Sequence, residues 1–257
     1  MALMLLAHAH GLVVTAIHVD HGLRAESASD IDVIDPVAES LGISVIVHSV
    51  QVEHGPNLEA RARAARYGVM PDDVMTGHTA DDQAETVLIN LLRGAGAQGL
   101  GAMRPGFSRP LLALRRSDTH AVCAAAGIAT VTDSTNTDPK FQRNRVRNEL
   151  LPLMTEISLR DPVPLLVRSA DVLRDDNDLL EELARNLDPT DAVALAAAPA
   201  PLARRALRQW LSDPYPPDLA TLERIMAVAR GETLACDIGE NREIRRSKQR
   251  LILQLLG

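Results

Sequence analysis

The stretch Gly77-His-Thr-Ala-Asp-Asp-Gln-Ala-Glu-Thr-Val87 decides the fold that we expect for this chain. Just before it, Asp73-Val-Met-Thr76 predicts a short buried strand. Within and after it, apolar residues recur at the spacing of one helix face, namely Ala84, Val87, Leu88, Leu91 and Leu92. A strand that leads directly into a helix is typical of a parallel α/β sheet, and such sheets bind ligands at this edge.

The polar residues of this stretch gather where the helix should begin. Thr79 is the natural N-cap residue, because its side chain can satisfy a backbone amide of the first turn. His78 precedes the cap, and Asp82 and Glu85 are three residues apart on one helix face. We therefore name His78, Asp82 and Glu85 as candidate catalytic residues.

Other interpretations of the same residues stay open at this point. Asp82 could serve only as a capping acid, Glu85 could be a solvated partner of Arg93, and His78 could be structural. The three side chains could also converge on a cation. A dedicated zinc site is not expected, because zinc sites normally include further histidine or cysteine ligands.

The composition limits the classes of function. The chain has 257 residues, 2% aromatic residues and a net charge of −7, so no global basic field indicates a nucleic acid. Its two cysteines form no CxxC pair, which argues against a cysteine-held metal. No apolar run approaches the roughly 20 residues of a membrane span, and the N-terminus lacks a signal-peptide pattern. We expect a cytoplasmic protein with no membrane contact.

Along residues 1–150, strands and helices should alternate. Met1–Ala9 predicts a helix that ends at Gly11, and Leu12–Val19 predicts a buried strand. Glu26–Leu41 predicts a helix, Ile43–Val50 another strand, and Asn57 the cap of a further helix. The expected fold class is α/β, an open parallel sheet with helices on both faces.

Two later segments carry candidate substrate-binding residues. Gly94–Pro110 is rich in glycine and proline, which favours a mobile loop beside the site, although a slack surface loop stays open. A helix is expected over Ser117–Ala126, with a short strand near Thr130. Arg143, Arg145 and Arg147 then lie close together on a predicted helix, where they suit phosphate unless they form a solvated basic face.

Beyond Pro152 the strand alternation stops, and helices are expected over Leu165–Leu187, Leu202–Leu211 and Asp218–Ala229. Two or three short strands should follow within Leu234–Leu255. Basic residues crowd one of these strands, namely Arg242, Arg245, Arg246, Lys248 and Arg250. We place a boundary near residue 150, which gives a catalytic domain over 1–150 and a mainly helical domain over 151–257.

Together these motifs resemble the tRNA(Ile)-lysidine synthetases, which belong to the N-type ATP-pyrophosphatase (PP-loop) superfamily. The resemblance covers about the first 150 residues and rests on six segments in order. They are His18–Arg24, Leu58–Tyr67, Gly77–Gly94, Arg109-Pro-Leu-Leu112, Asp133-Ser-Thr-Asn136 and Arg143–Pro152.

The resemblance implies ATP-dependent ligation of free L-lysine to C2 of the wobble cytidine in tRNA(Ile) with a CAU anticodon. The tRNA is first adenylated, with ATP and Mg²⁺, and the amine then displaces AMP. Asp82 and Glu85 would hold the lysine ammonium and accept its proton. Arg109, Asp133, Asn136, Arg143, Arg145 and Arg147 would bind substrate. His18, Val19, Asp20 and His21 would lie against the adenosine. A homodimer is kept open.

The chain departs from the family pattern at its start. The family's Ser-Gly-Gly-X-Asp-Ser loop, which holds pyrophosphate on backbone amides, would precede Met1. The chain as written is therefore expected to bind ATP poorly. Two rival interpretations remain, a catalytically inactive tRNA-binding module and an N-type tRNA thiolase. The thiolases compared use cysteine pairs, which this chain lacks.

Overall fold

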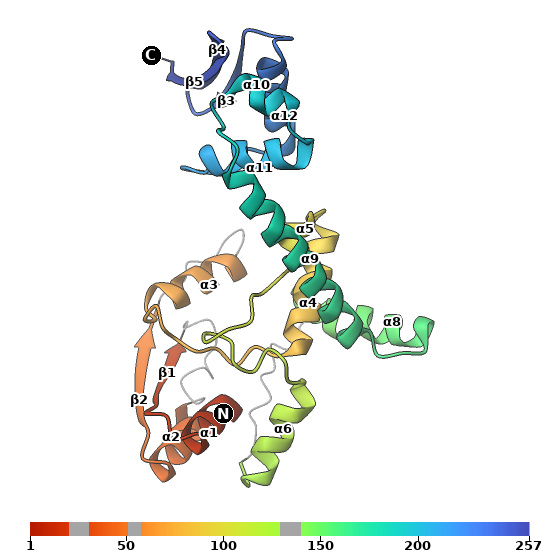
Figure 1. Ribbon diagram of the computed structural model, residues 1–257. Coiled ribbons are helices and arrows are strands. Elements are labelled where there is room, and N and C mark those ends of the chain that lie inside the picture. Colours follow the sequence, from red (N-terminus) through yellow and green to blue (C-terminus); the bar gives the residue numbers. More distant parts are fainter. Residues whose placement is uncertain (21–30, 51–57, 129–139, 257) are drawn as a thin grey trace. The chain divides into compact units, whose positions relative to one another are not determined.

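The computed structural model describes residues 1–20, 31–50, 58–128 and 140–256 (Figure 1). The chain divides into two compact units, Met1–Ala170 and Asp171–Gly257. This division falls later in the chain than the boundary near residue 150 that the sequence suggested. The helix α9 (Pro162–Arg185) begins in the first unit and ends in the second.

The first unit alternates helices and strands over its N-terminal third and is helical afterwards. Its elements before α9 are α1 (Ala2–Ala9), β1 (Thr15–Asp20), α2 (Ile31–Ser40), β2 (Ser44–Ser49), α3 (Leu58–Gly68), α4 (Ala80–Leu92), α5 (Ala97–Leu100), α6 (Arg116–Ala125), α7 (Gln142–Arg145), the π-helix η3 (Val146–Leu150) and α8 (Leu151–Ser158).

The strands β1 and β2 pair in parallel, in a register that runs from Thr15 opposite Ser44 to Asp20 opposite Ser49. The helix α2 lies between them in the chain, so β1–α2–β2 is the parallel crossover unit that the alternation predicts. A small apolar cluster of Met4, Ala38 and Ile43 joins α1 and α2 to the start of β2. The predicted α/β class is confirmed in these elements.

The predicted strand at Asp73–Thr76 is wrong. This segment is irregular, and the Thr76 amide donates to the Ser108 carbonyl at 2.9 Å rather than to a neighbouring strand. Within the described ranges the segment lies in no sheet, and β-branched or apolar composition does not form a strand without a hydrogen-bonded neighbour. The predicted strand near Thr130 falls outside the described residues.

The helix α4 follows the prediction at its start. Thr79 has extended backbone angles and is the N-cap residue, and Ala80, Ala84 and Leu88 are buried against Val146, Leu151 and Val163. The far end differs from the prediction, since Leu91 and Leu92 are exposed. The buried face of α4 therefore ends near Leu88, which keeps Asp82 and Glu85 in its packed half.

The glycine-rich segment after α4 is fixed to that helix instead of hanging free. The Gln83 side chain donates to the Met103 carbonyl at 2.8 Å and accepts from the Met103 amide at 2.9 Å. Asn90 adds a bond from its amide to the Gly99 carbonyl at 2.7 Å. Gln83 is buried, so these bonds form where water competes little.

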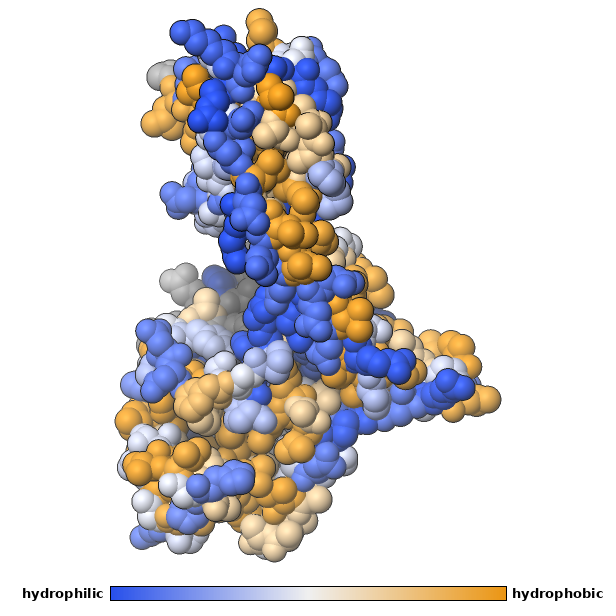
Figure 2. Space-filling view, in the orientation of Figure 1, coloured by the Kyte–Doolittle hydropathy of each residue, from blue (hydrophilic) through white to orange (hydrophobic). Residues whose placement is uncertain are grey.

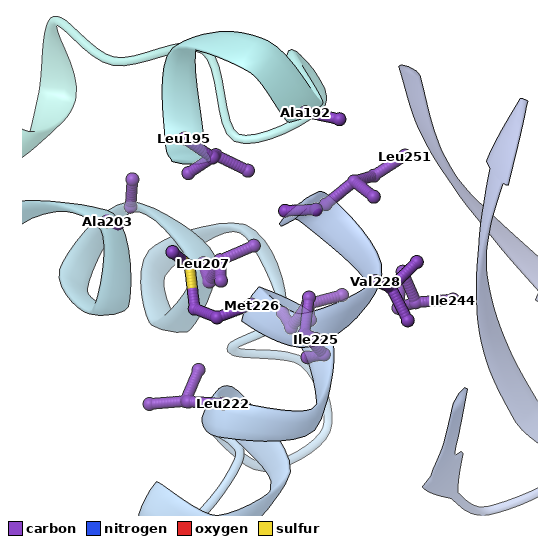
Figure 3. Close-up of a cluster of buried hydrophobic side chains, with 13 residues drawn as sticks. Ala192, Leu195, Ala203, Leu207, Leu222, Ile225, Met226, Val228, Ile244 and Leu251 are labelled. Carbon is purple, nitrogen blue, oxygen red and sulfur yellow. The ribbon is translucent and has the colours of Figure 1, made fainter. Parts of the chain in front are cut away.

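The second unit packs α9's C-terminal half and three further helices with an antiparallel sheet. Its elements are α10 (Ala192–Ala197), α11 (Ala200–Trp210), α12 (Leu219–Arg230), β3 (Ala235–Gly239), β4 (Arg242–Ser247) and β5 (Arg250–Leu255), with strand order β3-β4-β5. Its apolar core brings together Leu195, Leu207, Ile225, Ile244 and Leu251 from α10, α11, α12, β4 and β5 (Figure 3). The mainly helical character and the short strands are confirmed.

The basic residues of the C-terminal strands are more dispersed than predicted. They are spread over β4, the β4–β5 turn and β5. Arg246 donates to the Ala229 carbonyl at 2.8 Å and Arg242 to the Asp213 carbonyl at 2.7 Å, so both are used inside the unit. Arg245, Lys248 and Arg250 stay exposed.

One helix of the first unit presents apolar side chains to solvent. Leu153 and Ile157 of α8 and the following Leu159 are exposed, and Figure 2 shows apolar surface at this end of the unit.

The described helices include none long and apolar enough to cross a membrane.

Candidate active site

Asp82 uses its two carboxylate oxygens for different purposes. Oδ2 accepts from the backbone amide and from the hydroxyl of Thr79, each at 2.8 Å, which closes the N-terminal turn of α4. Oδ1 faces three guanidinium groups, with Arg116 Nη2 at 3.1 Å, Arg143 Nη2 at 3.3 Å and Arg147 Nη2 at 3.7 Å. The capping role and the role in a charged site therefore coexist in one side chain.

Glu85 is the most deeply buried charged residue of the site, with no exposed side-chain surface. Its Oε1 accepts from Arg147 Nε at 2.7 Å and Arg116 Nη2 at 3.1 Å. Its Oε2 accepts from Arg143 Nε at 2.7 Å and Arg147 Nη2 at 3.0 Å. Four charge-assisted bonds compensate the cost of burying this carboxylate.

The three arginines come from separate elements and outnumber the two acids. Arg116 opens α6, Arg143 lies in α7, and Arg147 lies in η3. With Asp82 and Glu85 they form what we call the arginine cluster, whose formal charge is three minus two, or +1. Their side chains are 30%, 25% and 23% exposed respectively, so each guanidinium is only partly withdrawn from solvent.

A second ion pair holds α4 beside α6. Asp81 accepts from Arg115 Nε and Nη2, both at 3.1 Å, and from the Arg116 amide at 2.7 Å. Arg115 also pairs with Asp161, and the Ala80 amide donates to the Leu114 carbonyl at 2.8 Å. The starts of α4 and α6 are thereby fixed together, which sets where Arg116 can reach.

The electrostatics keep these groups ionised. Burial works to raise the pKa of Asp82, but the Thr79 amide and the charges of Arg116 and Arg143 outweigh it, and the pKa is lowered from 3.8. Burial works to lower the pKa of Arg147, but its bonds to Glu85 dominate, and the pKa is raised from its ordinary value. Asp82 is therefore a carboxylate, and Arg147 a cation, at neutral pH.

The structure places two arginines, Arg145 and Arg116, differently from the grouping that the sequence suggested. Arg145 was grouped with Arg143 and Arg147, but it is 62% exposed and pairs with Glu149 at 2.9 Å, four residues along the chain. It points away because residues four apart share a helix face and its neighbours two positions away do not. Arg116 was not considered, although a basic pair follows Arg109-Pro-Leu-Leu112 and precedes a predicted helix.

His78 lies next to this site and is held through Thr76. Thr76 Oγ1 is 2.8 Å from His78 Nδ1, and the same hydroxyl donates to the Ser108 carbonyl at 3.0 Å. A hydroxyl has one proton, so once it donates to Ser108 it can only accept from His78. In the neutral ring this places the proton on Nδ1 and the lone pair on Nε2.

Three of the four residues predicted to contact adenosine lie on β1, whereas the arginine cluster is built on α4, α6, α7 and η3. His18, Val19 and Asp20 form the carboxyl end of β1, while His21 lies outside the described residues. A cavity of about 850 Å³, mostly apolar, borders β1 from Thr15 to His18 and includes Gly77. His18 Nε2 is buried and has no hydrogen-bond partner within the described part of the chain. Among the residues that the structure describes, neither Asp82, Glu85 nor an arginine lines the cavity.

The remaining predicted substrate-binding residues do not join the arginine cluster. Arg109 donates to the Arg104 carbonyl at 3.4 Å, and its buried Nε has no partner in the described ranges. Asp133 and Asn136 fall outside the described residues. Over the same ranges, no three His, Cys, Asp or Glu side chains gather as a metal site.

Comparison with known proteins matches both halves of the chain. The PP-loop domain family matches residues 1–154, and the TilS substrate binding domain matches residues 191–252. The tRNA(Ile)-lysidine synthase of Nocardia farcinica is 38% identical over 253 residues, which cover 90% of this chain and 80% of that protein. The chain belongs to the tRNA(Ile)-lysidine synthase family.

A second relative in the tRNA(Ile)-lysidine synthase family gives the extent of the match. The enzyme of Mycolicibacterium paratuberculosis is 42% identical over 212 residues, which cover 77% of this chain and 66% of that protein. The chain thus spans about two thirds of the length of this relative. Both the resemblance in the motifs and the parallel α/β class are confirmed.

The fold of the lysidine synthase family is shared with other tRNA-modifying enzymes. The U34-tRNA thiolase NcsA of Methanococcus maripaludis, solved with its [4Fe-4S] cluster, aligns with a TM-score of 0.52 at 16% identity, over 67% of each chain. At that identity the similarity shows the fold alone. Here Cys123 is buried in α6 of the first unit, and Cys236 lies in β3 of the second.

Proposed function

We propose that this chain ligates free L-lysine to C2 of the wobble cytidine in tRNA(Ile) with a CAU anticodon, in an ATP-dependent reaction through an adenylated tRNA. The observation that carries the proposal is the arginine cluster at the start of α4, in a chain whose relatives are named for lysidine formation. Adenylation develops negative charge on phosphate, and fixed guanidinium groups stabilise such charge.

We assign different roles to the two acids. Lysine must lose a proton from its ammonium before the amine attacks, so a carboxylate near the amine helps to hold it and to accept the proton. Asp82 is ionised and 17% exposed, which suits contact with the amine. Glu85 has no exposed surface and four arginine bonds, so we assign it an indirect role through those arginines. His78, which directly precedes the cap residue Thr79, is a second candidate to accept this proton.

We assign ATP to the side of the first unit that contains β1. Its cavity of about 850 Å³ is in the range of nucleotide-sized pockets, and the orphaned His18 Nε2 offers a polar contact in an otherwise apolar wall. Magnesium would act on the phosphates of ATP. The described side chains do not gather as a Mg²⁺ site, so no step here is assigned to the ion.

We assign tRNA contact to the second unit as well, over the matched substrate-binding region. Arg245, Lys248 and Arg250 are the exposed basic residues of its β4–β5 hairpin. Reversing their charges should weaken tRNA binding and reduce its salt dependence by roughly one unit of slope for each lost phosphate contact. An unchanged slope would mean that these residues do not face tRNA. Cytoplasmic location and a homodimer remain part of the proposal.

The test is incorporation of labelled lysine into a tRNA(Ile) transcript, with lysine and ATP varied separately. We expect Asp82→Asn to raise the KM for lysine at least tenfold with little change for ATP. Equal loss for both substrates, or none for either, would contradict the assignment. The assay should include a second version that carries a Ser-Gly-Gly-X-Asp-Ser loop with its strand before Met1, which the family pattern predicts to be more active. tRNA binding without incorporation in both versions would favour the inactive binding module.

A further inference from the structure

We propose that Arg116, Arg143 and Arg147 together form an oxyanion-binding site, and that Glu85 is the positioning residue that sets its geometry. The oxyanion is a phosphate group or the α-carboxylate of an amino acid. The site rests on contacts within the chain, whereas the source of the anion rests on the proposed function.

The first argument is how the guanidinium groups are used. Arg143 and Arg147 face Glu85 and Asp82 with Nε and Nη2, and Arg116 with Nη2 alone. Over the residues that the structure describes, Nη1 of all three arginines and Nε of Arg116 make no hydrogen bond, and none of these atoms is a buried orphan. Each arginine therefore keeps N–H donors for a ligand that approaches from solvent.

The second argument is the balance of charge. Three guanidinium groups lie within reach of two carboxylates in the arginine cluster, and the third adds repulsion between cations. The charge of Asp81 also acts on Arg116 and Arg147, but Asp81 is itself paired with Arg115. An ion-pair network that only joined α4, α6 and η3 would not need this third cation. A bound oxyanion would bring the formal charge of the arginine cluster from +1 to zero for a carboxylate, or to about −1 for a doubly charged phosphate.

The third argument is rigidity. A solvent-exposed arginine loses side-chain entropy when it binds a ligand, and this loss weakens binding. In the arginine cluster that ordering is already present, because the buried Glu85 fixes three side chains from three elements with bonds of 2.7–3.1 Å. Glu85 thus acts on a ligand only through the arginines, without touching it.

The direct test uses inorganic phosphate and the chain as it stands. Arginine Nε–H signals, observed by NMR in protein labelled with 15N-arginine and assigned by substitution, should shift for Arg116, Arg143 and Arg147 as phosphate is added. Arg116→Gln should weaken phosphate binding at least tenfold. The matched control is Arg168→Gln, an exposed arginine of α9 in the same unit, which should leave binding unchanged. Unshifted signals, or equal affinity in the two variants, would overturn the site.

The role of Glu85 has its own test. A purely electrostatic role and a positioning role predict opposite changes in phosphate affinity when Glu85 is replaced by Gln. Glu85→Gln raises the formal charge of the arginine cluster by one, so charge alone predicts tighter phosphate binding. Loss of positioning predicts binding weaker by at least tenfold, and Glu85→Asp should restore part of it. Tighter binding would overturn the positioning role. If Glu85→Gln does not fold, the wild-type spectra decide: uniform Nε–H shifts for the three arginines support a fixed site, and a shift of one alone overturns it.

Competition distinguishes the two sources of the anion. If the site takes the α-carboxylate, L-lysine should displace phosphate and 1,5-diaminopentane should not. If it takes a phosphate of ATP or tRNA, neither amine should displace it and ATP should. Displacement by both amines alike would overturn the assignment of an oxyanion. Phosphate binding by the chain, with no lysine incorporation in either version of the assay, would refute the proposed function and leave the site standing.

Discussion

The start of α4 and the core of the second unit are both buried, but charged side chains form the first and apolar side chains form the second. The arginine cluster places a fully buried glutamate among three arginines, whereas the core around Leu207 and Ile225 contains apolar side chains alone. Apolar packing stabilises a folded unit without requiring particular side chains, and it tolerates many substitutions that conserve volume. Buried ion pairs contribute little net stability, but removing one partner of such a pair strongly destabilises the protein. Because the arginine cluster contributes little net stability, we infer that its buried charges serve the proposed function.

The largest expected effect tests the charged network itself. Glu85→Gln leaves three guanidinium groups facing a neutral amide, and we expect a loss of stability of about 4 kcal/mol around α4. Hydrogen exchange of the segments covering α4 and η3, followed by mass spectrometry, would measure it. The control is Glu149→Gln, which breaks only the exposed pair with Arg145 and should leave exchange unchanged. Similar exchange in both variants would contradict the contrast drawn between the two regions.

A cavity in the apolar core should cost somewhat less. Leu207→Ala removes a fully buried side chain at the centre of the second unit, and we expect a loss of about 3 kcal/mol. The single tryptophan, Trp210, lies in α11, so its fluorescence during urea unfolding reports on this unit. Leu219→Ala, at an exposed position of α12, serves as the control and should stay within about 0.5 kcal/mol of wild type.

One carboxylate of the second unit is expected to contribute as a helix cap. Asp191 accepts from the amides of Val193 and Ala194, both at 3.0 Å, at the start of α10. Asp191→Ala should therefore cost about 1 kcal/mol, measured by the same Trp210 fluorescence. Asp175→Ala, an exposed acid of α9, should have no measurable effect. A loss as large as that expected for Glu85→Gln would show that the second unit also depends on a charged network.

The smallest expected effect is a change in pH dependence. The folded state lowers the pKa of Asp82 below 3.8, so its contribution to stability is present above pH 3.8 and lost as pH falls through the lower folded value. In Asp82→Asn, acid unfolding followed by far-UV circular dichroism should depend less on pH below about 4. The Trp210 fluorescence curve should keep its wild-type shape. A changed fluorescence curve with an unchanged dichroism curve would contradict the assignment of this pH dependence to Asp82 in the first unit.

Much of this organisation could be predicted from local sequence. Thr79 and Asp82 indicate the start of α4 in the sequence, because capping depends on residues a few positions apart. The parallel β1–α2–β2 unit and the helices of the second unit follow from periodicity in the same way. Asp73–Thr76 was predicted as a strand because composition alone does not reveal whether a neighbouring strand is present.

The charged site was only half predictable, for a similar reason. Asp82 and Glu85 were singled out from their spacing, but their arginine partners come from positions 31 to 65 residues away. Arg147 faces Glu85 and Arg145 faces solvent, and only the helical phase of their segment separates them in the local sequence. A π-helical turn in that segment alters this phase. Arg116 enters the arginine cluster through tertiary packing of α6 on α4, which no spacing in the sequence encodes.

Gln83 sits between the two acids in the sequence and holds the glycine-rich segment through the backbone of Met103 alone. A primary amide is the side chain of this length that offers a donor and an acceptor together, so glutamate or leucine at this position would leave one or both groups of Met103 unmatched. The side chain at position 103 takes no part in that attachment. The attachment therefore places no requirement on the side chain at position 103, and the segment stays anchored to the helix that carries the charged site whichever side chain stands there.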